Sequence, residues 1–262
     1  MQLTIEADLD YALPASATVP LQLEAANTPD QRVLESSLEI PDLPAPHWVP
    51  ACGGVGRRAW VEAVDTLKCR YRATVELHRP TSDMRKAPFV PFAQLPADAI
   101  AYLMASRYCQ SDMFEQFVTS EFGHYAGGEK IAAIRDWIEL SFSYVRGSSD
   151  ETTTAIDTFV TRQGVCRDYA HVLISLARAA HIPARAVAVY APDVSPPDFH
   201  AVAEVYVGDA WHLVDATGMR QPDTLAKIVV GHDAADIDFM TTYGPAGQKS
   251  SLNEQSVRVA RR

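Results

Sequence analysis

The sequence is poor in cysteine, and its four cysteines stand far apart. Cys52, Cys69, Cys109 and Cys166 form no Cys-x-x-Cys pair. Zinc sites usually use closely spaced ligand pairs, and disulfide scaffolds are usually shorter chains with a higher density of cysteine. A phosphate-binding glycine loop is also missing. We therefore predict no metal site, no bound cofactor and free thiols, with two disulfides left as the alternative.

Long hydrophobic runs and an excess of positive charge are missing too. No stretch approaches the roughly 18 apolar residues of a membrane-spanning helix. The chain has 23 basic and 33 acidic residues, a formal net charge of −10, and no basic tract. This balance argues against nucleic acid and membrane as partners. Glu6, Asp8 and Asp10 lie where a secretory signal would be basic and then apolar, so we predict a cytoplasmic protein.

The first part of the chain is predicted to consist of β-strands. Residues 66–77 alternate apolar and polar side chains, with period two, which is typical of a strand buried on one face. The segments 3–13 and 33–40 are shorter and less regular strand candidates, and turns rich in proline and glycine separate them. We predict a small antiparallel β-sandwich as an N-terminal domain over residues 1–90.

The remainder is predicted to be an α+β domain over residues 91–262. Residues 78–96 contain four prolines and read as the boundary. Beyond it, apolar residues recur at helical spacing in three segments: 96–109, 128–145 and 166–182. Strands are predicted at 184–191, 200–207 and 210–217, and a short C-terminal strand at 256–260 is assigned to this second domain.

Cys166 lies at the predicted start of the third helix. Free N–H groups and the positive end of the helix dipole favour an anion at such a position. Gly164 allows the backbone to turn sharply into the helix. A reactive cysteine also needs a neighbouring base, so position alone does not separate a nucleophile from an inert buried thiol.

The strands that follow supply a base. A two-residue turn at positions 208–209 joins the second and third strands and places Asp215 opposite Val202. His200 lies two residues from Val202, on the same face. His200 and Asp215 are then diagonal neighbours, roughly 7–8 Å apart at the backbone, and a carboxylate there can orient the imidazole. A three-residue turn would move Asp215 to the opposite face.

Both faces of this hairpin are largely apolar, so one of them should pack on the helix that begins at Cys166. If the face that carries His200 does so, Cys166, His200 and Asp215 converge. The sequence pattern alone does not choose between the two faces.

Two segments carry a resemblance to a known family. GVCRDYAHVLISLARAAHIPARAVAVY, at 164–190, and DFHAVAEVYVGDAWHLVDAT, at 198–217, are similar to the transglutaminase-like superfamily of cysteine enzymes. The likeness spans about residues 95–220, and the whole chain resembles bacterial transglutaminase-like cysteine proteases with an N-terminal β domain. The resemblance implies a papain-like core and a catalytic triad. It assigns Cys166 as the nucleophile, His200 as base and then acid, and Asp215 as the group that orients His200.

The oxyanion hole is less defined in the sequence. The backbone N–H of Cys166, at the helix start, is a natural first donor. The second donor is open among Gln163, Tyr144 and Trp137, and Tyr169 and Trp211 are further candidates for the pocket.

The expected reaction is acyl transfer from an amide bond of a peptide or protein substrate. Water as the second nucleophile would make the protein a protease or amidase, and an amine would make it a transglutaminase. We favour hydrolysis because no feature of the sequence indicates an amine-binding tunnel. A non-catalytic binding or scaffold protein on the same fold is the alternative of a different class. The oligomeric state is left open.

Overall fold

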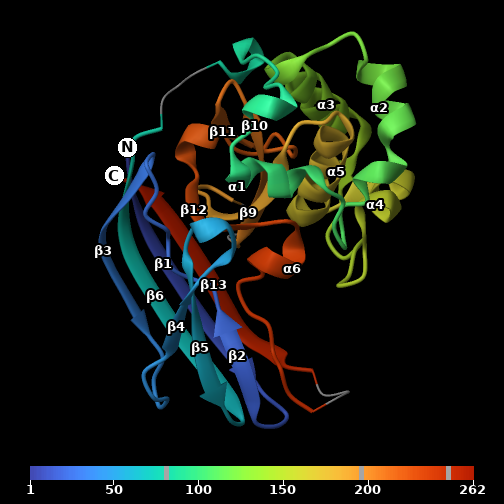
Figure 1. Cartoon of the computed structure of the whole chain (residues 1–262). Helices are drawn as coiled ribbons and strands as arrows, with labels where there is room; N and C mark the ends of the chain where they lie inside the picture. The colour runs from blue at the N-terminus through green and yellow to red at the C-terminus, as the bar shows by residue number, and fades with distance from the viewer. Residues whose placement is uncertain (80–82, 195–197, 246–248) are drawn as a thin grey trace.

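The N-terminal part of the chain folds into two antiparallel sheets that face each other (Figure 1). The computed structural model describes residues 1–79, 83–194, 198–245 and 249–262. One sheet has the order β13-β1-β6-β3, formed by Ser251–Arg261, Gln2–Ala12, Thr66–Leu77 and Gln31–Glu39. The other has the order β2-β5-β4, formed by Ala17–Leu21, Arg57–Ala63 and His47–Pro50. The predicted antiparallel sandwich is confirmed.

Strand β6 has the limits that its alternation predicted. Its inward side chains, among them Tyr71 and Val75, are fully buried, whereas Lys68 and Arg70 are exposed. β6 pairs with β1 over the whole length of both, which gives the sheet a long central pair. The alternation of the pleat therefore sets which face of this sheet is buried.

The C-terminal strand β13 is present, but it does not pair with the second domain, to which the sequence assigned it. It pairs with β1, from Leu3 opposite Arg261 to Ala12 opposite Ser251. The free edge of β1 offers unpaired backbone groups that a second strand can satisfy. The last residues thus return to the first sheet, and the two termini lie close together (Figure 1).

The second part of the chain is an antiparallel sheet covered by helices. The sheet order is β11-β10-β9-β12, from Ala210–Val214, His200–Val207, Ala184–Tyr190 and Ala226–Gly231. The helices are α2 (Glu115–Phe122), α3 (Gly127–Ser141), α4 (Ala155–Thr161) and α5 (Cys166–Ala179), and α5 packs on β9 and β10. A two-stranded pair, β7 (Ser143–Tyr144) with β8 (Gln163–Gly164), precedes α5. Within the described ranges, no helix combines the length and apolarity needed to cross a membrane.

The predicted helix over 96–109 is the main error in secondary structure. Only α1 (Ala97–Ile100) and one 3₁₀ turn form, because Tyr102 leaves helical geometry at φ −97° and ψ 16°. Ile100 and Met104, predicted to line a buried stripe, are 48% and 70% exposed. The sequence analysis also missed α2, α4, β12 and the one-turn helix α6 (Ala234–Ile237), which are short and weakly periodic.

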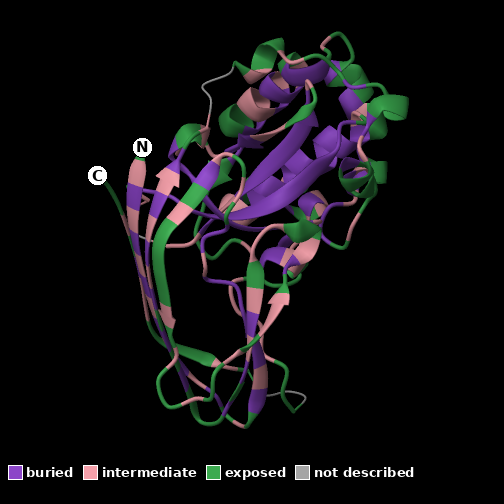
Figure 2. Cartoon of the chain, turned by 60° about the vertical axis from the view of Figure 1, so that its left-hand side comes forward, coloured by how far each residue is buried: buried purple, intermediate pink, exposed green. Residues whose placement is uncertain are grey.

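Helix α5 lies at the centre of the second part and is buried over most of its length (Figure 2). Its buried residues show which face of the sheet it packs on. Its apolar residues share one core with Ala203, Val205 and Val207 of β10. Val202 and Leu213 belong to a separate core on the other face of the sheet. The helix therefore packs on the odd-numbered face of β10, and not on the face to which strand alternation assigns His200.

The two parts of the molecule share a hydrophobic core and several buried hydrogen bonds. The side-chain amide of Gln31, near the start of β3, donates to the backbone oxygen of Lys227 (2.9 Å) and accepts from its N–H (2.7 Å). The Tyr190 hydroxyl donates to the backbone oxygen of Leu23 (2.6 Å). These contacts hold β12 and β9 against the sandwich.

All four cysteines are free thiols, so the alternative of two disulfides is not realised. Cys69 and Cys109 are buried, and burial raises the pKa of each thiol to about 12. Cys52 and Cys166 are partly accessible. Any thiol chemistry at neutral pH therefore has two candidate residues.

A buried histidine in α5 predicts how stability depends on pH. Nε2 of His171 accepts a hydrogen bond from the Ala234 N–H (3.1 Å), and the ring stacks on Tyr108. Burial lowers the pKa of His171 to about 4, against 6.5 for an exposed histidine. The unfolded chain thus binds more protons between these values, so stability is complete above pH 6.5 and falls as the pH drops towards 4.

We expect roughly 3 kcal/mol of unfolding free energy to be lost over this range through His171 alone. His171→Gln keeps an acceptor for the Ala234 N–H and should flatten the dependence. Urea denaturation at a series of pH values measures how the unfolding free energy depends on pH, with His124→Gln, at an exposed histidine, as the matched control. Equal acid sensitivity in all three proteins would rule out this role for His171.

Candidate active site

Cys166 is the first residue of α5, and its neighbours shape the turn before it. The carboxylate of Asp168 accepts the backbone N–H of Val165 (2.8 Å) and pairs with Arg167 (3.0 Å). A Cβ at Gly164 would lie 2.7 Å from the Asp168 Cβ, so only glycine fits there. Asp168 thus stabilises the backbone that enters the helix and fixes the position from which Cys166 projects.

The hairpin between β10 and β11 has the predicted register. Gly208 and Asp209 have φ of +58° and +62°, as a two-residue type I′ turn requires. Val207 pairs with Ala210, and Ala203 pairs with Val214. Asp215, the next residue, therefore lies beside the start of β10, as predicted.

His200 and Asp215 are in direct contact and buried. His200 Nε2 lies 2.9 Å from Asp215 Oδ2. The carboxylate also accepts the N–H and hydroxyl of Thr217 (2.9 and 2.6 Å) and the N–H of Arg220 (3.1 Å). The sequence analysis missed these two supporting residues, although an aspartate two residues before a threonine is typical of a turn that folds back on its own side chain.

The charges of this pair reinforce each other. Burial opposes the imidazolium, but hydrogen bonds to Asp215 and Cys166 outweigh it and raise the pKa of His200 to about 10. Burial likewise opposes the carboxylate, and the hydrogen bond and charge of His200 nevertheless lower the pKa of Asp215. The pair is therefore an imidazolium and a carboxylate at neutral pH.

Cys166 lies on the other side of the His200 ring. The thiol is close enough to His200 to raise its pKa, and because Nε2 contacts Asp215, Nδ1 is the ring nitrogen left for the sulfur. The condition stated for convergence, packing of the His200 face on the helix, is not met. The three residues meet because Cys166 begins α5 and His200 begins β10, so the contact forms at two element ends rather than across the packed face.

Tyr144 also reaches Cys166. Its side chain lies beside Cys166, within range of the charge of the thiol. Burial and the neighbouring Cys166 raise the pKa of Tyr144 to about 12, so the hydroxyl keeps its proton. Tyr169 is buried behind it, with ring centroids 6.1 Å apart. The structure thus places both tyrosines of the predicted set at the site.

The other two pocket candidates are Gln163 and Trp211. Gln163, in β8, is exposed. Trp211 packs on Arg185, 3.9 Å from its guanidinium carbon, and lines a cavity of about 840 Å³ where the sandwich meets the core. Trp211 pairs with Tyr206 near the turn of the hairpin, whereas His200 begins β10 at the other end, and this explains why Trp211 is not beside the nucleophile.

Comparisons with known proteins agree with this architecture. A family model described as the transglutaminase-like superfamily matches residues 115–216, which include Cys166, His200 and Asp215. A solved structure from Cytophaga hutchinsonii, described as a candidate cysteine protease, is 35% identical, with a TM-score of 0.91. The match covers 99% of this chain and 90% of that one. The chain belongs to the transglutaminase-like superfamily.

Another solved structure is less similar to this superfamily member. The periplasmic domain of TgpA from Pseudomonas aeruginosa is 16% identical over 82% of this chain and 87% of that one, with a TM-score of 0.44. No curated protein matches the sequence.

Proposed function

We propose that this protein is a cysteine-dependent acyl-transfer enzyme that hydrolyses amide bonds of peptides or proteins, with Cys166, His200 and Asp215 as its triad. The observation that carries the proposal is the position of the His200 ring. One nitrogen is held by a buried carboxylate, and the other faces a partly accessible thiol at a helix start. An inert thiol needs neither an imidazole nor a carboxylate behind it.

The first half of the reaction forms a thioester. The Cys166 thiolate attacks the amide carbonyl carbon, a C–S bond forms, and the carbonyl electron pair moves to oxygen. When the C–N bond breaks, the His200 imidazolium gives its Nδ1 proton to the leaving amine. Asp215 keeps the ring in place and stabilises its charge throughout.

The oxyanion needs donors at the site of attack. The backbone N–H of Cys166, at the start of α5, and the hydroxyl of Tyr144, beside Cys166, are both at hand. A substrate oxygen placed between them could accept from both groups. Tyr144 is therefore our choice among the candidate second donors.

The second half releases the acyl group. Neutral His200 takes a proton from water, the hydroxide adds to the thioester carbon, and the C–S bond breaks to give a carboxylic acid and the thiolate. An amine in place of water would give a new amide by the same steps. The description of the 35% identical relative as a candidate protease supports water.

The first test is the rate of thiol alkylation as a function of pH. Iodoacetamide labelling at pH 6, followed by mass spectrometry, should modify Cys166 at least about 10-fold faster than the three other cysteines. The physical reason is that a protonated His200 can pair with a thiolate at this pH, whereas burial keeps Cys69 and Cys109 protonated.

His200→Ala is the control, and it should slow the labelling of Cys166 while the other cysteines keep their rates. If Cys166 reacts no faster than the buried thiols, or if the rate is insensitive to His200, the triad is not assembled. In that case the binding or scaffold function would be favoured.

A further inference from the structure

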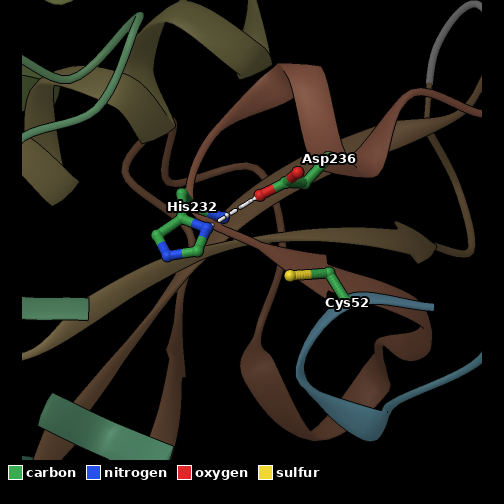
Figure 3. A group of neighbouring side chains, drawn as sticks. All are labelled: Cys52, His232 and Asp236. Carbon is green, nitrogen blue, oxygen red and sulfur yellow. Dashed lines mark hydrogen bonds and ion pairs between the residues drawn. The ribbon is translucent and has the colours of Figure 1, made fainter. Parts of the chain in front are cut away.

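A second group of cysteine, histidine and aspartate contains none of the triad residues (Figure 3). Cys52, His232 and Asp236 each offer one ligand atom, and these atoms all lie within 4.8 Å of one another. His232 Nδ1 and Asp236 Oδ2 are 2.9 Å apart, and Oδ2 also accepts the backbone N–H of His232 (2.8 Å). All three residues are partly exposed, so the group is accessible from solvent.

The group is assembled from both parts of the molecule. Cys52 begins a 3₁₀ turn (Cys52–Gly54) between β4 and β5 of the sandwich, His232 directly follows β12, and Asp236 lies in α6. Close approach of these elements depends on glycine. A Cβ at Gly56, where φ is +80°, would lie 2.2 Å from the Ile228 oxygen, and one at Gly231 would lie 2.1 Å from the Asp236 Cβ. The backbone is therefore built to bring the three side chains together.

Tyr102 borders the group and contacts two of its members. Its hydroxyl lies near the Cys52 thiol, and its ring lies 4.9 Å from the His232 ring, centroid to centroid. The side chain is buried, which limits its motion. A fixed donor beside a sulfur atom is what a metal-bound thiolate uses to orient its lone pairs.

We propose that Cys52, His232 and Asp236 form a zinc site with three protein ligands. A thiolate, an imidazole and a carboxylate are the donors that Zn²⁺ takes, whereas Mg²⁺ and Ca²⁺ prefer oxygen donors alone. Zinc–ligand bonds of about 2.0–2.3 Å place ligand atoms roughly 3.3–3.8 Å apart. Side-chain rotations that move the ligand atoms by about an ångström therefore bring them to bonding distance of the metal. The fourth coordination position stays open to water or a ligand.

Zinc binding releases one proton, and two protein ligands balance the charge of the metal. Burial, followed by the charge of Asp236, raises the pKa of the Cys52 thiol, so the metal-free residue is protonated at neutral pH. Zinc displaces this proton and binds the thiolate. His232 binds through Nδ1, so the proton that Nδ1 donates to Asp236 in the metal-free protein moves to Nε2. One proton is released, and the charge of Zn²⁺ is neutralised by the thiolate and the carboxylate.

The consequence of binding is a cross-link between the sandwich and the core. Cys52 belongs to the first part of the molecule and the other two ligands to the second, so occupied zinc would tie them together. The sequence analysis predicted no metal site because it looked for paired spacing. Here, 180 positions separate Cys52 from His232.

The test is zinc binding by the full chain carrying Cys166→Ala, which removes the other accessible thiol. After treatment with a chelator, calorimetric titration with Zn²⁺ at neutral pH should show one equivalent bound at micromolar or lower Kd, with release of one proton. Co²⁺ should give the near-ultraviolet charge-transfer band of a cobalt thiolate. Bound zinc should also raise the melting temperature and protect Cys52 from alkylation.

Cys52→Ser and His232→Ala should each weaken binding by about 100-fold or more and remove these signals. The matched control is His78→Ala, because His78 forms a surface pair with Glu76 (3.0 Å) and is none of the three proposed ligands, so it should change nothing. Unchanged binding in Cys52→Ser, or a Kd no tighter than that of a surface histidine pair, would overturn the proposal. Because binding is read without activity, a failure here leaves the proposed acyl transfer intact.

Discussion

The Cys166→Ala variant is expected to lose amide hydrolysis entirely, and Asp215→Asn is expected to lower kcat/KM by about 10²–10⁴-fold. The first change removes the nucleophile. The second leaves the size of the side chain unchanged but alters which ring nitrogen of His200 carries the proton. A fluorescein-labelled, unfolded casein serves as a general peptide substrate, and release of soluble fluorescence measures hydrolysis.

The effect of Asp215→Asn follows from its hydrogen bonds. The oxygen of the amide can still accept from Thr217, and its NH₂ group then faces His200 Nε2. Nε2 must become the acceptor, so the ring proton moves to Nδ1, beside Cys166. Neutral His200 can then no longer take a proton from the thiol or from water through Nδ1, and both halves of the reaction slow.

Two further measurements make this prediction specific. Asp198→Asn, near the hairpin but outside the triad, should keep the activity of the parent protein. Incorporation of dansylcadaverine into the same casein reports amine transfer. If the parent protein shows this signal in place of hydrolysis, and Cys166→Ala loses it, the enzyme is a transglutaminase. Full hydrolysis in Asp215→Asn would contradict the assigned role of Asp215.

Glu204→Gln is expected to destabilise the fold by about 3–5 kcal/mol. Glu204 is completely buried in β10, and its carboxylate lies 2.6 Å from Arg185 and 2.7 Å from Lys227. Although burial opposes the charge, Lys227 and Arg185 lower the pKa of Glu204, which is therefore ionised. The glutamine variant would leave two buried cations without the anion that balances them.

The cost is large because water cannot replace the lost charge. Arg185 and Lys227 are both nearly inaccessible, and among the described residues Lys227 keeps Asp30, at 3.3 Å, as its one other anionic partner. Since Asp30 belongs to the sandwich, the variant also weakens the contact between the two parts. Urea denaturation followed by circular dichroism measures the change in unfolding free energy.

The matched control is Glu151→Gln. Glu151 pairs with Lys249 at 2.6 Å, the same distance as in the buried pair, but both side chains are more than two-thirds exposed. Water screens this pair, so a change of at most about 1 kcal/mol is expected. Similar destabilisation in the two variants would show that burial of the Glu204 network is not what makes it important.

The local sequence pattern was sufficient to predict elements whose contacting residues lie close together in the sequence. The alternation of residues 66–77 predicted β6 and its buried face, because the pleat repeats every two residues. Gly208 and Asp209 predicted the register of the hairpin and thus the contact between His200 and Asp215. The helix predicted over 96–109 failed, and two of its apolar residues, Ile100 and Met104, are exposed, so tertiary packing does not stabilise a helical stripe there.

The sequence by itself determined the sandwich strand, the hairpin and the position of Cys166 at a helix start, since each depends on residues within a few positions of one another. Only the tertiary structure decided the rest. It brought Cys166 to His200 at element ends, paired β13 with β1, and gathered Cys52 with His232 and Asp236. These contacts join distant segments, and what selects them is burial of shared apolar surface, which leaves no periodic signal in the sequence.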